Sequence, residues 1–146
     1  MATQTAVKPS LTLKRRFKAP PAKVFAAWTD PDKVKRWMGP QGVEVMSAET
    51  DARKGGSYRW IMKAPNGETH DVGGSYLEVV TNQKLVFTWA WKSTPDRVSQ
   101  VTVELKPDGD GTMLTLTHEQ FFDEDARDHH QQGWVGSLDK LEKFVA

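Results

Sequence analysis

The chain has 146 residues, of which 38% are hydrophobic and 27% are charged, and its formal net charge is +1. This length favours a single globular domain with its own core, and so small a net charge gives no electrostatic reason to expect nucleic acid or an anionic membrane as a partner. The absence of cysteine excludes a disulfide framework, a thiolate nucleophile and a cysteine-ligated zinc site.

The N-terminal sequence MATQTAVKPS lacks the apolar segment of a signal peptide, and no run of apolar residues approaches the length of a membrane span. We therefore expect a cytoplasmic protein. Residues 1–9 should form a flexible tail, and residues 10–146 a single domain without an internal repeat or linker.

The first element is a half-buried strand, because SLTLKRRFKAP places Leu11, Leu13 and Phe17 on one side and mainly basic residues on the other. Pro20-Pro21 then starts a short helix, PAKVFAAWTD, since proline is tolerated at the first helical position. A second short helix, PDKVKRW, should end at Gly39-Pro40. The pair lacks the exposed polar face of a recognition helix, which argues against DNA binding.

From residue 41 to residue 120 the pattern is typical of strands joined by short turns. Asn66-Gly67 is the strongest two-residue hairpin signal. Six strands are expected, in the segments VEVMSAETD, SYRWIMKA, Glu68–Val80, KLVFTWAW, RVSQVTVEL and TMLTLTHEQ. With the first strand, this predicts an antiparallel sheet of about seven strands.

The last element is a long helix that begins near Asp123, where three consecutive acidic residues suit a helix N-terminus. Its apolar stripe contains Trp134, Leu138, Leu141 and Val145. The predicted fold is therefore α+β: a curved antiparallel sheet, two short helices after the first strand, and a long C-terminal helix across the concave face.

Large aromatic side chains share one face of the predicted sheet. Period-two counting puts Phe87, Trp89 and Trp91 together in one strand, and Trp60 and Met62 together in another. An apolar sheet face must be covered, and the last helix is the only long element available. Trp28 and Trp37 of the short helices are expected to pack in the core. The other four tryptophans, Trp60, Trp89, Trp91 and Trp134, either belong to a solid core as well or line a cavity suited to an apolar ligand.

The last helix changes character along its length. Its C-terminal half is suited to sealing a dry core, whereas Arg127, His130 and Gln131 lie on the same side in the N-terminal half. We expect the mouth of a cavity at this polar half. Gly133 weakens the helix by about 1 kcal/mol relative to alanine, and its missing side chain would let a neighbouring segment approach beside Trp134. The alternative is that Gly133 and Gly136 reflect weak selection on a surface.

Several segments together resemble the SRPBCC superfamily, the START-like or birch-pollen-allergen-like proteins with the helix-grip fold. They are RFKAPPAKVFAAWTDPDKVKRWMGP, GGSYRW, KLVFTWAW, TMLTLTHEQF and GWVGSLDKLEKF. The subgroup they resemble is related to the C-terminal domain of the activator of the heat-shock-protein-90 ATPase, and the likeness extends from about Leu11 to Val145. The resemblance implies the same helix-grip architecture. It leaves open ligand carriage, cyclase-type catalysis and a co-chaperone role, since fold does not fix function.

The residues that could take part in catalysis or bind a metal ion form no recognised sequence motif. The pairs His118-Glu119 and His129-His130 lack the spacing of metal ligands, and no nucleophile elbow or phosphate-binding loop is present. His118 and His130 are expected to face the cavity, where they either hydrogen-bond locally at the rim or move protons together with a glutamate. His70 is expected on the surface.

The hypothesis from the sequence is non-enzymatic binding of a small apolar or aromatic ligand, without cofactor or metal. The expected ligand-binding residues are Trp60, Met62, Tyr76, Phe87, Trp89, Trp91, His118, His130, Trp134 and Leu138. One alternative, implied by the resemblance, is a stress-response interaction module with a chaperone partner. The other is an enzyme of cyclase or hydrolase type that uses His118 and a buried glutamate. The oligomeric state, monomer or homodimer, stays open.

Overall fold

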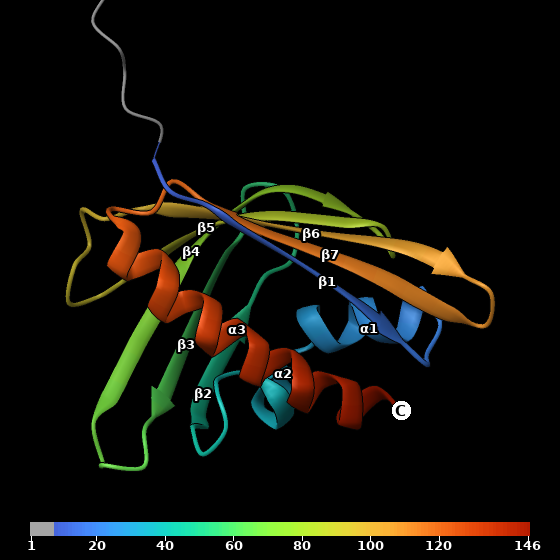
Figure 1. The fold of residues 1–146 in the computed structure, drawn as a ribbon, viewed down its shortest axis with the longest axis horizontal. Helices are drawn as coiled ribbons and strands as arrows, with labels where there is room; N and C mark the ends of the chain where they lie inside the picture. Colours follow the sequence, from blue (N-terminus) through green and yellow to red (C-terminus); the bar gives the residue numbers. More distant parts are fainter. Residues whose placement is uncertain (1–7) are drawn as a thin grey trace, which may run out of the picture.

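A computed structural model describes residues 8–146, and within this range the chain forms seven strands and three helices (Figure 1). Residues 1–7 of the expected tail lie outside the described range. In chain order, the elements are β1 (Leu11–Phe17), α1 (Pro21–Thr29), α2 (Pro31–Trp37), β2 (Glu44–Thr50), β3 (Ser57–Lys63), β4 (Thr69–Val80), β5 (Lys84–Trp91), β6 (Ser99–Asp108), β7 (Gly111–Glu119) and α3 (Glu124–Val145).

The seven strands form one antiparallel sheet in the order β1-β7-β6-β5-β4-β3-β2. Strands β2 to β7 follow one another as a meander, and β1 pairs with β7 at the far edge. The sheet curls around α3, which crosses its concave side, while α1 and α2 lie near the C-terminal end of α3 (Figure 1). This arrangement confirms the predicted α+β fold and the order of its elements.

The helices begin where the sequence signals indicate. Pro21 and Pro31 are the first residues of α1 and α2. Proline has no backbone N–H, and this costs nothing at the first helical position because an N–H there would have no partner within the helix. The Asp123 side chain caps α3 by accepting a hydrogen bond of 2.8 Å from the Ala126 amide. The predicted start of the long helix near Asp123 is therefore confirmed.

The core lies between the concave face of the sheet and one side of α3. The apolar stripe predicted for α3 is buried, with Trp134, Leu138, Leu141 and Val145 each at most 3% exposed. From the sheet, the Trp89 ring of β5 meets Trp134, with their ring centroids 5.2 Å apart. No helix within residues 8–146 combines the length and apolar character needed to cross a membrane.

The segment between α2 and β2 packs closely against α3. A Cβ atom at Gly136 would lie 3.2 Å from Pro40 Cα, whereas one at Gly133 would lie 3.7 Å from Pro40 Cγ. Lys140 Nζ donates hydrogen bonds to the carbonyl oxygens of Pro40 and Val43 at 3.4 and 3.2 Å. The close approach expected at Gly133 is found at Gly136 instead, because a Cβ atom at Gly133 would make only an ordinary van der Waals contact.

Candidate functional site

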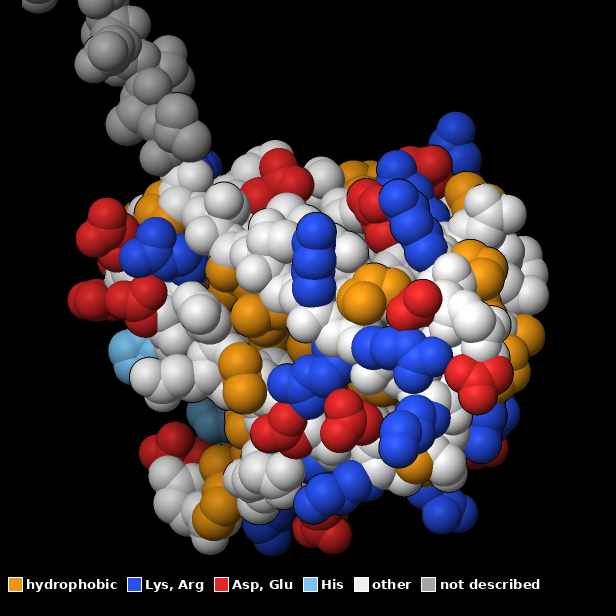
Figure 2. Space-filling model, turned by 45° about the vertical axis from the view of Figure 1, so that its right-hand side comes forward, with side chains coloured by type: hydrophobic (Ala, Val, Ile, Leu, Met, Phe, Trp, Pro, Cys, Tyr) orange, Lys and Arg blue, Asp and Glu red, His pale blue; other side chains and the backbone are white. Residues whose placement is uncertain are grey.

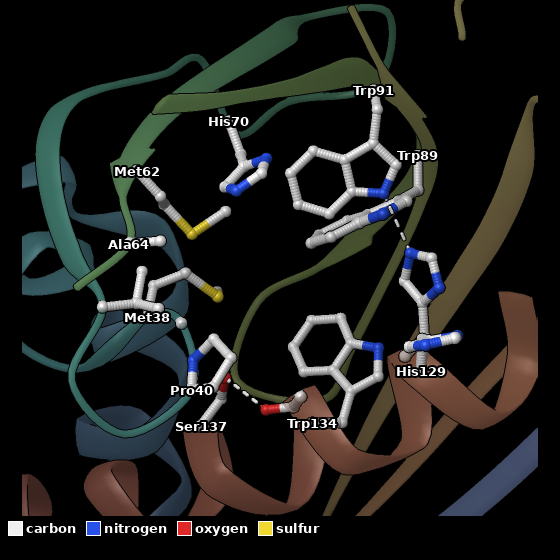
Figure 3. A pocket seen from close by; sticks show the side chains of 14 residues that line it. Met38, Pro40, Met62, Ala64, His70, Trp89, Trp91, His129, Trp134 and Ser137 are labelled. Atoms are coloured by element: carbon white, nitrogen blue, oxygen red, sulfur yellow. Dashed lines mark hydrogen bonds between the residues drawn. The ribbon is translucent and has the colours of Figure 1, made fainter. Parts of the chain in front are cut away.

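A pocket of about 360 Å³ lies between the N-terminal half of α3, the segment 38–43, and the neighbouring ends of β3, β4 and β5 (Figure 3). It occupies the position at which the sequence predicted a cavity mouth, beside the polar half of the last helix. The lining residues are Met38, Gly39, Pro40, Val43, Met62, Ala64, His70, Trp89, Trp91, His129, His130, Gly133, Trp134 and Ser137.

The wall of the pocket is aromatic and aliphatic. Trp89 is central to it, because its ring centroid lies 5.5 Å from that of Trp91 and 5.2 Å from that of Trp134. The thioethers of Met38 and Met62 face these rings from the opposite side (Figure 3). No lysine, arginine, aspartate or glutamate is among the lining residues. Such a surface favours an uncharged apolar or aromatic guest.

The structure divides the ten residues expected from the sequence into two groups. Met62, Trp89, Trp91, His130 and Trp134 line the pocket. The other five are absent from its wall and are at most 2% exposed, packed in the core: Trp60, Tyr76, Phe87, His118 and Leu138. The pocket therefore lies toward one end of the sheet, and close packing fills the rest of the concave face.

His118 lies behind the pocket wall and connects three strands to α3. The Trp134 indole N–H donates to His118 Nδ1 at 3.0 Å. Because Nδ1 accepts this bond, the ring proton resides on Nε2, which donates to Ser99 Oγ at 2.7 Å. The Ser99 hydroxyl in turn donates to the Trp89 carbonyl oxygen at 3.2 Å. Two of the three wall tryptophans, Trp134 through its indole and Trp89 through its backbone, are thus joined by way of one buried imidazole.

The environment of His118 keeps the imidazole neutral. Burial, with a smaller contribution from nearby His130, lowers the pKa of His118 to about 2. In this tautomer Nε2 already carries a proton and cannot accept one from Ser99. The buried polar residues of the described range are Ser99, Thr112, His118 and Ser137, so no buried carboxylate accompanies the ring. This arrangement suits structural support and does not provide a general base.

His130 fixes another part of the wall. The Trp91 indole N–H donates to His130 Nε2 at 2.9 Å, as the dashed line in Figure 3 shows. His130 Nδ1 donates to the Ala126 carbonyl oxygen at 2.6 Å. Burial is the main cause that lowers the pKa of His130. Both ring nitrogens of His130 are thus paired within the protein, and the bond from Trp91 joins the end of β5 to α3.

Sequence reasoning missed several lining residues. His70 is exposed, as expected from the sequence, and it also forms part of the pocket wall between Met62 and Trp91 (Figure 3). Period-two counting from the buried Val72 would have placed His70 on the inner face, because residues two apart in a strand share a face. The segment from Met38 to Val43 carries no such signal, since its place beside α3 depends on tertiary packing.

The site has no arrangement of ligands for a metal ion. Within residues 8–146, no three histidine, aspartate or glutamate side chains are grouped closely enough to hold one. His130 has no free ring nitrogen, and His129 uses Nδ1 to donate to the Asp125 carbonyl oxygen at 2.7 Å. The chemistry available at the pocket is apolar contact together with a small number of hydrogen bonds.

The comparison with family models gives one match. The model described as "Activator of Hsp90 ATPase homolog 1-like protein" matches residues 18–146, which is most of the chain and includes the whole pocket. No curated protein matches the chain at a significant level.

Solved structures of similar fold are numerous. A protein from Chromobacterium violaceum is 30% identical, with a TM-score of 0.86 over 93% of this chain and 96% of that one. The AHSA1 protein from Silicibacter pomeroyi is 29% identical, with a TM-score of 0.83 over 92% and 96% of the two chains. An AHSA1-like protein from Aeromonas hydrophila, 22% identical over 94% and 92% with a TM-score of 0.80, shows the same fold.

Proposed function

The chain belongs to the family of Activator of Hsp90 ATPase homolog 1-like proteins, which have the helix-grip fold, and we propose that it binds a small apolar or aromatic ligand in the pocket beside α3. The observation that carries this proposal is the composition of the pocket wall. Three tryptophans and two methionines line it, and none of its side chains is an acid, a lysine or an arginine.

The size and the construction of the pocket support the same function. A volume of about 360 Å³ is at the lower end of the range for small-molecule sites and suits a compact ligand. The hydrogen bonds from Trp91 to His130 and from Trp134 to His118 hold two wall tryptophans in defined orientations. A wall that is ordered in advance loses little conformational entropy when a ligand binds.

The test is a calorimetric titration with 2-methoxynaphthalene, an uncharged bicyclic probe, alongside NMR signals of the Trp91 and Trp134 indole N–H groups. We expect saturable binding that shifts both signals. Ala64→Trp introduces a large ring at the pocket wall and should weaken binding at least tenfold. The matched variant is Leu77→Trp, at a position 45% exposed on β4, and it should bind as the unmodified protein does.

Two results would contradict the proposal. One is the absence of saturable binding, and the other is an equal affinity of the Ala64→Trp and Leu77→Trp variants for the probe. Either result would mean that the pocket does not take up an apolar ligand of this size.

A chaperone contact, which the family description suggests, has less support from the surface. Protein partners are recognised through contiguous apolar patches. The large apolar side chains exposed in the described range, Met46, Leu77, Val98, Phe122 and Val135, come from different elements or connecting segments. On the face shown in Figure 2, charged groups of both signs separate small apolar areas. We therefore propose ligand binding as the primary function.

A further inference from the structure

We infer that His70 recognises the polar end of the ligand, and that this ligand is an aromatic compound carrying a hydroxyl group. The inference rests on the proposed ligand-binding function and makes it more specific. Its basis is the set of polar atoms around the pocket that remain available to a ligand.

Most polar side chains of the pocket are already paired within the protein. Both ring nitrogens of His130 are hydrogen-bonded, and the Trp134 indole N–H is bound to His118. The Ser137 hydroxyl donates to the Gly133 carbonyl oxygen at 2.9 Å. His129 is exposed, and its Nδ1 donates to the preceding turn of α3. None of these groups has both of its polar functions free. The Trp89 indole N–H also lacks a hydrogen-bond partner in the described range, but it is buried and can only donate.

His70 differs from these residues. Neither of its ring nitrogens has a hydrogen-bond partner in the described range, and its side chain is 47% exposed. In β4 it is paired with Met62 of β3, and its ring centroid lies 6.1 Å from that of Trp91. Figure 3 shows the imidazole directed into the space between these two side chains. A ring of the ligand packed on the tryptophans would bring its edge to this imidazole.

The chemistry beside His70 selects a hydroxyl group over a carboxylate. A neutral imidazole has one nitrogen that accepts a hydrogen bond and one that donates, and a hydroxyl group can satisfy either. The Glu68 carboxylate lies 3.9 Å from His70 Nε2 and would repel an anionic ligand. No lysine or arginine lines the pocket to compensate for that repulsion. The ligand class that fits is therefore a phenol-like aromatic alcohol.

The experiment compares three probes of the same ring system by calorimetry at about pH 7.5, where a phenolic hydroxyl keeps its proton. 2-Naphthol can donate a hydrogen bond, 2-methoxynaphthalene cannot, and 2-naphthoate is anionic. We expect 2-naphthol to bind about fivefold more tightly than its methyl ether, the effect of one neutral hydrogen bond. The naphthoate should bind more weakly than the ether, and Glu68→Gln should reduce this difference.

Single-residue variants test whether the preference for 2-naphthol over its methyl ether depends on the His70 side chain. His70→Phe keeps an aromatic ring and removes both nitrogens, so it should bind 2-naphthol and the methyl ether equally while retaining affinity for the ether. Leu77→Phe introduces the same ring at an exposed position of β4 outside the pocket wall, and it should keep the preference for 2-naphthol.

The outcomes separate this inference from the function on which it rests. If the ether binds but 2-naphthol has no advantage, or if the advantage survives His70→Phe or disappears in Leu77→Phe, the assignment to His70 is wrong and ligand binding stands. Tighter binding of the naphthoate than of 2-naphthol would overturn the proposed ligand class. If none of the three probes binds, the proposed function itself fails.

Discussion

The Trp134 indole N–H donates to His118 Nδ1 across 3.0 Å, and this one bond determines which nitrogen of the buried histidine carries its proton. The remaining proton on Nε2 is directed at Ser99, and the chain of hydrogen bonds continues to the backbone of β5. A lining residue of the pocket is therefore held in place by a residue that does not touch the pocket.

Replacing His118 by alanine should lower the free energy of unfolding by about 2–4 kcal/mol. The variant leaves the buried Trp134 N–H without its acceptor and opens space in a fully packed region. Urea denaturation measures the change. His129→Ala is the control, because His129 is exposed and its loss should change stability by less than about 0.5 kcal/mol. Equal losses in the two variants would contradict the structural role of His118.

The free energy of unfolding should decrease as the pH falls from neutral through the pKa of an unfolded histidine and on toward the pKa of folded His118. Burial holds the pKa of folded His118 at about 2, against an ordinary value of 6.5. Between these values the unfolded chain binds a proton that the folded chain does not, so acid favours unfolding. For His118 alone we expect a loss of about 2 kcal/mol between about pH 7 and about pH 5, and the lowered pKa of His130 acts in the same direction.

The pH effect is checked by urea denaturation at both pH values in the unmodified protein and in His118→Gln, whose side chain does not titrate. The variant should lose less stability on acidification, by the amount attributed to His118. An identical pH dependence in the two proteins would show that the folded histidine has an ordinary pKa.

The two glycines of α3 should respond oppositely to alanine. At Gly133 the added methyl group meets only the Pro40 ring at 3.7 Å, so Gly133→Ala should stabilise the protein by about 0.5–1 kcal/mol through helix propensity. At Gly136 it would meet the Pro40 and Gln41 backbone at 3.2 and 3.3 Å, and that segment would have to move. Thermal unfolding should therefore rank Gly136→Ala below Gly133→Ala, and the reverse order would refute this packing argument.

Lys140 should stabilise the pocket segment that it touches. Lys140→Met removes the hydrogen bonds to the Pro40 and Val43 carbonyl oxygens and should lower the free energy of unfolding by about 1 kcal/mol. The Val43 amide, which donates to the Pro40 carbonyl oxygen within this segment, should exchange its hydrogen faster. Lys143→Met, at an exposed position of α3, is the control, and no change is expected at the Val43 amide.

The alternation of side chains in the strands and the 3.6-residue period of the last helix were enough to predict the architecture. Each pattern reports locally which side of an element is buried, and a sheet with one apolar face has few ways to cover it. Hence the seven strands, the place of α3 and the wall positions Trp89, Trp91 and Trp134 could be anticipated. The turn and capping residues fixed the boundaries, as Asp123 does for α3.

The tertiary structure decided how deep the pocket is and which polar atoms remain free in it. Trp60 and Leu138 share inner faces with the wall residues, yet packing closes the space around them. His118 and His130 point inward as expected, but each ring is fully hydrogen-bonded by tryptophans, backbone or serine. Neither nitrogen of His70 has a hydrogen-bond partner among residues 8–146. Periodicity gives the direction of a side chain, whereas the partner that it meets depends on residues distant in sequence, and only the folded chain brings these together.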